Sequence, residues 1–94
     1  MVKHVVCFKL KEGESVEKAK EVLLSMQGNV PMMRAIEVGV DLLKSARSYD
    51  VYLSVLLDDM KSLEEYQADP YHVNVVKKHM HSVVEKSVAI DFEV

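Results

Sequence analysis

Two segments of the sequence carry side chains that can accept and donate protons near neutral pH. His4 lies in the opening stretch 1–8 (MVKHVVCF), and Tyr66 and His72 lie in the segment 66–72 (YQADPYH). A neutral imidazole is the side chain best suited to act as a general base at this pH, and a nearby phenol can position it. These three residues are therefore the candidates for proton-transfer chemistry, provided that one apolar pocket collects them.

Each of the three residues also has a purely structural interpretation, and the sequence leaves both open. His4 can be a core histidine bonded to a carbonyl, His72 a capping or surface residue, and Tyr66 a packed aromatic side chain. If Tyr66 is buried, its hydroxyl needs a hydrogen-bond partner, and we expect a pocket histidine to serve.

The position of Pro70 places His72 in the first turn of a helix. Proline fits the first helical position and disfavours helical angles in the residue before it. We therefore expect Asp69 as the N-cap of a helix that runs to about Lys86. The positive end of the helix dipole then favours a neutral His72 ring, which is the form that a general base requires.

The other histidines predict no metal site. His79 and His81 are two residues apart on the same helix and point to different faces, while His72 and His79 share a face about 10 Å apart. No carboxylate joins them at a ligand spacing, and the three glycines form no phosphate-binding loop. We expect neither a metal nor a cofactor.

The rest of the chain predicts strands and helices in the order β-α-β-β-α-α-β. Strands are expected at 2–10, 34–40, 49–57 and 88–94 from their β-branched content and alternation. Helices are expected from a Ser15 N-cap to about Gln27, at 61–68 after a cap at Asp58 or Asp59, and from Pro70 onward. The last helix carries an apolar stripe formed by Val73, Val76, Met80, Val83 and Val84. Its basic pair, Lys77-Lys78, is expected on the solvated face.

This order of elements is the split β-α-β pattern of an α+β, ferredoxin-like fold with an antiparallel four-stranded sheet. The helices can cover only one face of such a sheet. Apolar side chains nevertheless occupy both faces of the strands at 2–10 and 49–57, and a large exposed apolar face marks an association site. We therefore expect residues 1–94 to form a single domain that makes a homodimer with the two sheets face to face.

Composition excludes several classes of protein. The 94 residues are 49% hydrophobic and 29% charged with a formal net charge of −3, which is typical of a folded domain and gives no electrostatic case for nucleic acid. The single cysteine, Cys7, excludes an internal disulfide and fits a reducing compartment. No apolar run approaches the roughly 20 residues of a membrane span, and the first residues lack a signal-peptide pattern. We expect a cytoplasmic protein with no membrane association.

Several short motifs resemble those of the stress-responsive α/β-barrel (Dabb) family, in order and over essentially the whole chain. They are Val2-Lys-His-Val-Val6 with Phe8-Lys9, Lys11-Glu-Gly13, Glu37-Val-Gly39, Ser48-Tyr-Asp50, the 66–72 segment, and Ile90-Asp-Phe-Glu-Val94. The resemblance implies a ferredoxin-like subunit that dimerises through its sheet into an α+β barrel. Plant members of the family resemble stress-induced or antifungal proteins.

One plant branch of the family comprises polyketide cyclases, and the resemblance carries its functional residues onto this chain. The general base falls on His72, the tyrosine that orients it on Tyr66, and the pocket histidine of the first strand on His4. The branch has a further histidine where this chain has Val51. A divalent-cation site built from backbone carbonyls would fall in residues 28–33.

Three functional hypotheses follow. In the first, a stress-linked dimer binds a small apolar or carbonyl-containing molecule in a pocket lined by His4, Tyr66 and His72. In the second, the protein is a cyclase- or lyase-type enzyme in which His72 removes a proton from carbon activated by carbonyl groups, Tyr66 positions His72, and His4 holds a substrate oxygen. In the third, it resembles the monooxygenases built on the same dimeric barrel, an analogy at the level of the fold.

Overall fold

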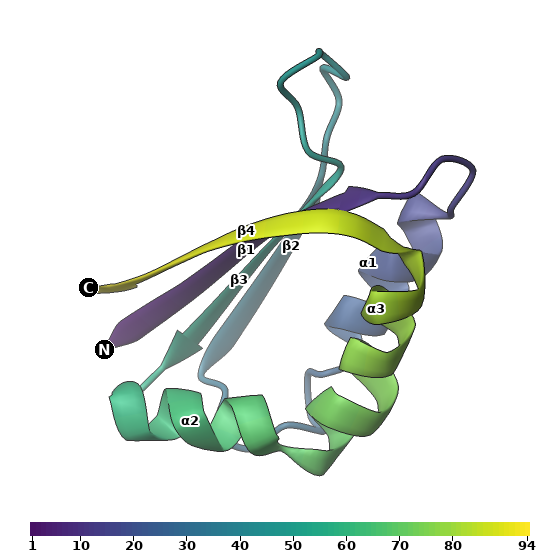
Figure 1. The fold of residues 1–94 in the computed structure, drawn as a ribbon. Helices are drawn as coiled ribbons and strands as arrows, with labels where there is room; N and C mark the ends of the chain where they lie inside the picture. Colours follow the sequence, from purple (N-terminus) through teal and green to yellow (C-terminus); the bar gives the residue numbers. More distant parts are fainter.

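In a computed structural model that describes all 94 residues, one antiparallel sheet is covered on one face by helices (Figure 1). The strands are β1 (Val2–Leu10), β2 (Ala35–Val40), β3 (Val51–Leu57) and β4 (Val84–Glu93). The helices are α1 (Val16–Leu24), α2 (Met60–Ala68), the π-helix η1 (His72–Lys77) and α3 (Lys78–Val83). The strand order β2-β3-β1-β4, with every neighbouring pair antiparallel, is that of a ferredoxin-like fold.

The helix starts follow the predicted caps. The Ser15 hydroxyl accepts a hydrogen bond from the Lys18 N–H, and Asp59, rather than Asp58, caps α2 by accepting from the Ser62 N–H. These bonds satisfy N–H groups that have no partner within the helix. The regular α1 helix ends at Leu24, three residues before the predicted end, and the chain continues through turns to Gly28, whose φ of +85° suits glycine.

The last helix and strand meet earlier than the sequence predicted. Residues from Pro70 onward are helical, as expected, but the helix ends at Val83 instead of Lys86, and β4 begins at Val84 instead of Val88. The Lys11 N–H donates to the Val83 carbonyl at 2.8 Å, and a register shift between Lys9 and Leu10 lets Val84 pair with Leu10. The sequence pattern alone predicts that the helix continues through residues 84–86. Pairing with β1 places these residues in a strand instead.

The core lies between the helices and the inner face of the sheet. His4, Val6 and Phe8 of β1 are directly opposite Val55, Leu53 and Val51 of β3, so these side chains share the inner face. Helix α1 contributes Ala19 and Leu23, and the last helix contributes Val76, Met80 and Val83. Val73, which was predicted in the same apolar stripe, is exposed, and His72 occupies the buried position instead.

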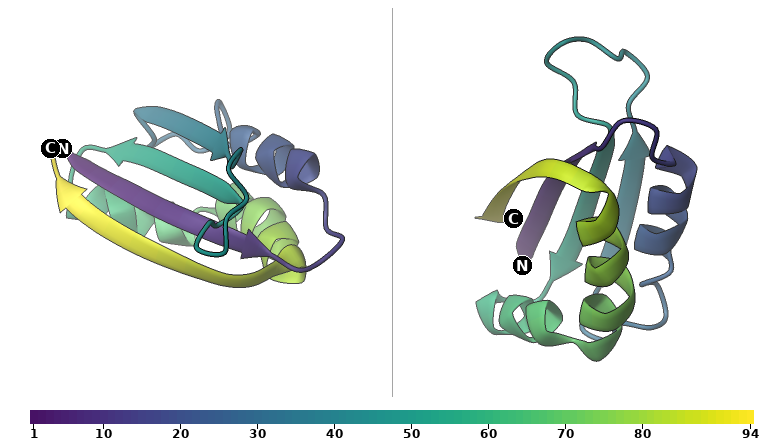
Figure 2. Two further views of the ribbon diagram at one scale, coloured as in Figure 1. Left: turned by 90° about the horizontal axis from the view of Figure 1, so that it is seen from above. Right: turned by 45° about the vertical axis from the view of Figure 1, so that its right-hand side comes forward.

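No helix of this chain packs on the outer face of the sheet, and that face is largely apolar. Val5, Cys7, Tyr52 and Leu56 lie on this face at the centre of the sheet, and Val88, Ile90 and Phe92 continue it along β4. Figure 2 shows that all helices lie on the opposite side of the sheet, while the loop between β2 and β3 extends beyond it. No helix of the structure is both long and apolar enough to cross a membrane.

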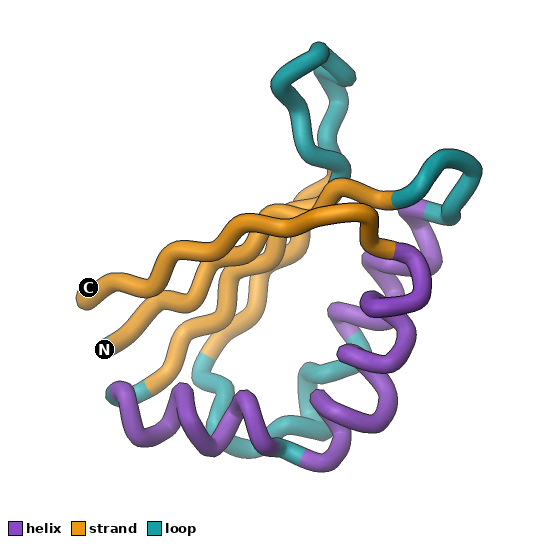
Figure 3. The backbone as a smooth tube through the Cα atoms, in the orientation of Figure 1, coloured by secondary structure: helices purple, strands orange, loops and turns teal.

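Figure 3 shows how the helices follow one another along the inner side of the sheet. Helix α2 runs across one end of the sheet, and the helical segment 70–83 then turns back along its length toward β4. At the turn between them, the Asp69 carboxylate accepts a hydrogen bond from the His72 N–H at 3.0 Å. Asp69 is therefore the predicted N-cap, and it fixes the start of the segment that carries His72.

Candidate functional site

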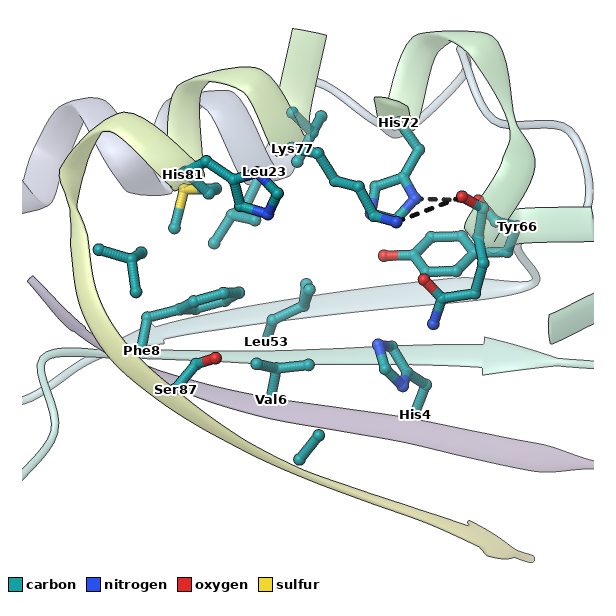
Figure 4. A pocket seen from close by; sticks show the side chains of 15 residues that line it. His4, Val6, Phe8, Leu23, Leu53, Tyr66, His72, Lys77, His81 and Ser87 are labelled. Atoms are coloured by element: carbon teal, nitrogen blue, oxygen red, sulfur yellow. Dashed lines mark hydrogen bonds between the residues drawn. The ribbon is translucent and has the colours of Figure 1, made fainter. Parts of the chain in front are cut away.

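A cavity of about 250 Å³ lies between the sheet and the helical segment 70–83. His4, Tyr66 and His72 all line the cavity, together with apolar side chains that include Val6, Phe8, Leu53 and Met80 (Figure 4). The structure therefore brings the three sequence-predicted residues into one pocket.

Two inward-facing side chains of β4 that line the cavity are small and leave space beside it. Ala89 is paired with Val6 and Ser87 with Phe8, so both lie on the inner face of the sheet and line the cavity. A mostly apolar pocket that opens beside two buried histidines is a candidate ligand site.

Strand pairing places an aspartate next to His4. His4 and Asp91 are cross-strand partners in β1 and β4, and His4 Nδ1 hydrogen-bonds to Asp91 Oδ1. Because a carboxylate only accepts hydrogen bonds, Nδ1 must carry the proton. Asp91 was not among the predicted site residues. Its alternation in the final strand with Ile90 and Phe92 was visible in the sequence, but its pairing with His4 depends on the sheet register.

Tyr66 lies at the centre of the site and is fully buried. Its ring stacks on the His72 ring with centroids 4.2 Å apart, and it meets the edge of the His4 ring at a centroid distance of 5.6 Å. The predicted hydrogen bond from the Tyr66 hydroxyl to a histidine is wrong: the hydroxyl points to Met26 Sδ at 3.8 Å. Burial raises the pKa of Tyr66, so the phenol stays protonated and does not act as a base.

His72 is held at both of its ends. Its backbone N–H is bound by Asp69, and its ring Nδ1 donates to the Tyr66 carbonyl oxygen at 2.9 Å. A carbonyl only accepts, so the proton of a neutral ring lies on Nδ1 and the lone pair on Nε2. Tyr66 thus orients His72 through its main chain and its ring face rather than through its hydroxyl.

Burial keeps His72 neutral. The pKa of His72 is lowered from its usual value, chiefly because the ring is removed from water, and the positive charge of Lys77 lowers it further. The Tyr66 carbonyl and the Asp69 carboxylate act in the opposite direction but do not outweigh burial. Burial therefore favours the neutral state that the sequence predicted from the helix terminus.

Each histidine keeps one ring nitrogen without a protein partner. His4 and His72 both bind protein acceptors through Nδ1, and neither Nε2 atom is sealed off from solvent. A neutral ring of this tautomer presents a lone pair, which can accept a hydrogen bond from a hydroxyl or remove a proton. The site therefore combines an apolar cavity with two directed acceptor atoms.

Lys77 also lines the cavity, and the sequence did not predict this. Helical spacing placed Lys77 and Lys78 together on the solvated face, but only Lys78 is exposed there. The Nζ of the half-buried Lys77 side chain is 3.4 Å from the Gln67 carbonyl oxygen, next in sequence to the Tyr66 carbonyl that His72 Nδ1 binds (Figure 4). The signal that could have found it is the presence of three β-branched residues, Val73, Val75 and Val76, which weaken a regular α-helix.

No group of three or more His, Cys, Asp or Glu side chains converges anywhere in the structure as a metal site would require. His79 and His81 lie on α3, and of the two only His81 lines the cavity. Residues 28–33, where the family resemblance implied a carbonyl cation site, form successive turns in which the Val30 carbonyl accepts from the Met33 N–H. That site stays a prediction.

The structure is similar to solved structures over its whole length. A dimeric protein of unknown function from Bacteroides fragilis is 26% identical with a TM-score of 0.79, and the match covers 99% of this chain and 95% of that chain. A protein from Arabidopsis thaliana is 25% identical with a TM-score of 0.82, over 100% of this chain and 95% of that chain.

Two more distant structures share the fold alone. A hydroxynitrile lyase from Passiflora edulis is 19% identical with a TM-score of 0.77, over 99% of this chain and 92% of that one. An antibiotic biosynthesis monooxygenase is 14% identical with the same TM-score, over 100% and 98%. Comparison with curated protein sequences found no match.

The sequence itself matches one family model. The model of the Stress responsive A/B Barrel Domain, named Dabb, matches residues 2–94, from the first residue of β1 to the end of the chain. The matched range includes every residue that lines the cavity. The chain therefore belongs to the stress responsive A/B barrel domain (Dabb) family.

Proposed function

We propose that this protein binds a small apolar molecule that carries a hydroxyl or enolised carbonyl group, with the polar group directed at His72. The observation that carries the proposal is the free Nε2 atom of a neutral, rigidly held His72 at the wall of an apolar cavity. A ligand that offers a hydrogen-bond donor satisfies this atom, while its apolar part replaces water beside Phe8, Leu53 and Met80.

A β-dicarbonyl compound is the most informative probe, because its enol form has both a carbonyl oxygen and a hydroxyl. We expect 1-phenyl-1,3-butanedione to bind the wild-type protein in calorimetric titrations. The variant Ala89→Leu fills the cavity from the sheet without touching either histidine, so it should weaken binding at least tenfold. His79→Ala, a change on the same helical segment but outside the cavity, is the matched control and should leave affinity unchanged.

The proposed binding function fails if wild-type protein does not bind the probe, or if Ala89→Leu binds it as tightly as wild type. The second outcome would place the probe elsewhere on the molecule. Because Ala89 is exposed at the edge of the cavity, the leucine side chain has room to enter it without displacing the core.

A second candidate function is acid–base catalysis, for which the pairing of His4 with Asp91 is the specific observation. His72 Nε2 takes a proton from the carbon next to a carbonyl group, and the electron pair of that C–H bond moves to the carbonyl oxygen to form an enolate. An aspartate beside a histidine orients the ring and stabilises the positive charge that forms when the ring is protonated. His4 in that state donates from Nε2 to the enolate oxygen.

Proton exchange tests the enzyme directly, without knowledge of the natural substrate. In D₂O, wild-type protein should speed replacement of the α-protons of 4-phenyl-2-butanone by deuterium, followed by NMR. His72→Ala should lower the protein-dependent rate by roughly 10²-fold or more, which is the scale of general base catalysis. Equal rates for wild type and His72→Ala would remove His72 from the chemistry and leave the binding function standing.

The monooxygenase hypothesis gains no comparable support. The monooxygenase and this chain share 14% identity, which indicates the fold and not the reaction. The hydroxynitrile lyase is likewise distant, and our proposal for His72 rests on the geometry of its ring rather than on that likeness.

We further propose that two copies of this chain associate through the outer face of the sheet. On β4 alone, Val88 is 52% exposed, Ile90 61% and Phe92 41%, and these side chains continue the apolar surface of β1 and β3. Lys3 and Ser54 also lie on this face, but an apolar surface that extends over three strands is unusual on a monomer, and a second copy offers the same surface in return. The similar protein from Bacteroides fragilis is dimeric.

Solution mass tests the dimer. Light scattering at micromolar concentration should give twice the mass of the 10.7 kDa chain. Ile90→Lys introduces a charge at the most exposed of the three β4 side chains and should shift the protein to the monomer, while Glu85→Lys, outside this apolar surface, should not. A wild-type monomer would contradict this use of the outer face.

A further inference from the structure

The loop between β2 and β3 holds two leucines out in solvent. Leu42 is 92% exposed and Leu43 is 80% exposed, more than any other large apolar side chain of the protein. A single exposed apolar side chain is common on protein surfaces, but two adjacent leucines that bury so little of their area are not explained by packing within the chain. Residues 41–50, which carry them, are called the arm below.

The arm is held in shape by its own hydrogen bonds. At its base the Asp41 N–H donates to the Asp50 carbonyl oxygen at 2.9 Å, and the Asp41 carboxylate accepts from the Lys44 N–H at 2.6 Å. The Ser45 N–H donates to the Ser48 hydroxyl, and the Ser48 N–H donates to the Ser45 carbonyl oxygen, both at 3.1 Å. The leucines are therefore presented in a defined arrangement, which lowers the entropy that a binding partner must remove.

The arm stands on the outer side of the sheet. In Figure 1 it rises from the ends of β2 and β3 away from the helices, and the view from above in Figure 2 shows it over the end of the sheet. A hollow of about 370 Å³ lies where the arm meets the outer face, and its lining includes Cys7, Gly39 and Tyr52 of the strands and Asp41 and Tyr49 of the arm. The arm and the apolar outer face therefore form one continuous concave surface.

The position of the leucines matches the height of a second sheet packed on the outer face. Sheets that pack face to face lie about 10 Å apart. Leu42 and Leu43 are two and three residues beyond Val40, the last residue of β2, and an extended chain covers at most about 7 Å in two residues and about 10 Å in three. A second copy packed on the outer face therefore brings its own sheet to the level of these side chains.

We propose that Leu42 and Leu43 pack against a second copy of this chain, so that the arm of each copy closes over the end of the other copy's sheet. This inference rests on the proposed association through the outer face and adds a second contact to it. Two-fold symmetry forms the contact twice, because each copy carries its arm and its apolar face on the same side. A lipid surface fits less well, since the chain has a net charge of −3 and anionic headgroups repel it.

The test measures the dissociation constant of the dimer by analytical ultracentrifugation over a dilution series. Leu42→Ser/Leu43→Ser should raise this constant at least about tenfold, because both arms lose their apolar contacts. Leu42→Met/Leu43→Met keeps these contacts and should keep most of the affinity. Neither leucine belongs to the buried core, so both variants should keep the wild-type circular dichroism spectrum.

Met60→Ser/Val75→Ser is the matched control. It removes two apolar side chains that are 58% and 41% exposed on the helical side of the molecule, and it should leave the dissociation constant unchanged. A wild-type monomer overturns both the proposed association and this inference. A wild-type dimer no tighter than that of the serine variant overturns the inference alone, as does an equal loss in the control. Wild-type binding to vesicles of phosphatidylcholine and phosphatidylglycerol that the serine variant lacks would assign the leucines to a lipid surface, which also overturns it.

Discussion

Removing the hydroxyl of Tyr66 should cost the protein almost nothing, although Tyr66 is fully buried. The hydroxyl points to Met26 Sδ at 3.8 Å, and a thioether is a weak acceptor. A well-formed hydrogen bond contributes about 0.5–1.5 kcal/mol to stability, and a buried polar group without a good partner costs about 1–3 kcal/mol. Here the weak contact with sulfur offsets only part of the cost of burying the hydroxyl, so removing both together changes little. We therefore expect Tyr66→Phe to change the free energy of unfolding by less than about 1 kcal/mol, in either direction.

Tyr71 provides the matched comparison. Its hydroxyl is partly buried and donates to Ser25 Oγ at 2.8 Å, which is a normal hydrogen bond. Tyr71→Phe should therefore destabilise the protein by about 0.5–1.5 kcal/mol, more than the same change at the better-buried Tyr66. Tyr66→Ala, which removes the ring between His4 and His72, should cost about 3–5 kcal/mol.

The assay is urea unfolding followed by circular dichroism at one protein concentration, since association makes apparent stability depend on concentration. A difference of 1 kcal/mol corresponds to about 4–8 °C in the melting temperature of a domain of this size. The reasoning is refuted if Tyr66→Phe loses more than about 1.5 kcal/mol, or more than Tyr71→Phe. Either result would mean that the hydroxyl has a stronger partner than Met26 Sδ.

Three further predictions concern stability. Asp69→Ala removes the cap of the His72 N–H and should cost about 1 kcal/mol in urea unfolding, whereas Glu64→Ala on the exposed side of α2 should change little. Gly28→Ala, at φ +85°, should cost about 1–2 kcal/mol by backbone strain, since nothing lies within 4 Å of the added carbon; an unchanged midpoint would contradict this. The lowered pKa of His72 means that the unfolded chain binds a proton more readily than the folded one, so stability should fall as pH drops below about 6.5 and should be insensitive to this group above it. His72→Gln should flatten that slope, and an identical slope in the variant would show that His72 is not its source.

Local signals in the sequence predicted the architecture because capping residues and a proline mark where the helices begin. Ser15, Asp59 and Asp69 accept the capping bonds that their residue types favour, and Pro70 begins the last helical segment. The errors lie where tertiary contacts decide. The junction at Val83 and Val84 is set by pairing with β1, and the helical spacing of residues 84–86 gives no information about that pairing.

The same distinction applies to the candidate site. His4, Tyr66 and His72 were predicted from residue type and from the position of Pro70, and the structure brings them together. Asp91 and Lys77 were missed for different reasons. The pairing of Asp91 with His4 depends on the register of β1 and β4, and the orientation of Lys77 depends on a π-helical turn that no α-helical periodicity describes.

The state of the His72 ring tests the central claim most directly, because both proposed functions require a neutral ring with a free Nε2. Two-bond ¹H–¹⁵N spectra of the imidazole groups at pH 7 distinguish protonated from unprotonated ring nitrogens. We predict a neutral His72 with its proton on Nδ1, and a change in the Nε2 resonance when 1-phenyl-1,3-butanedione is added. A positively charged His72 ring, a proton on Nε2, or an Nε2 resonance that saturating probe leaves unchanged would contradict the account.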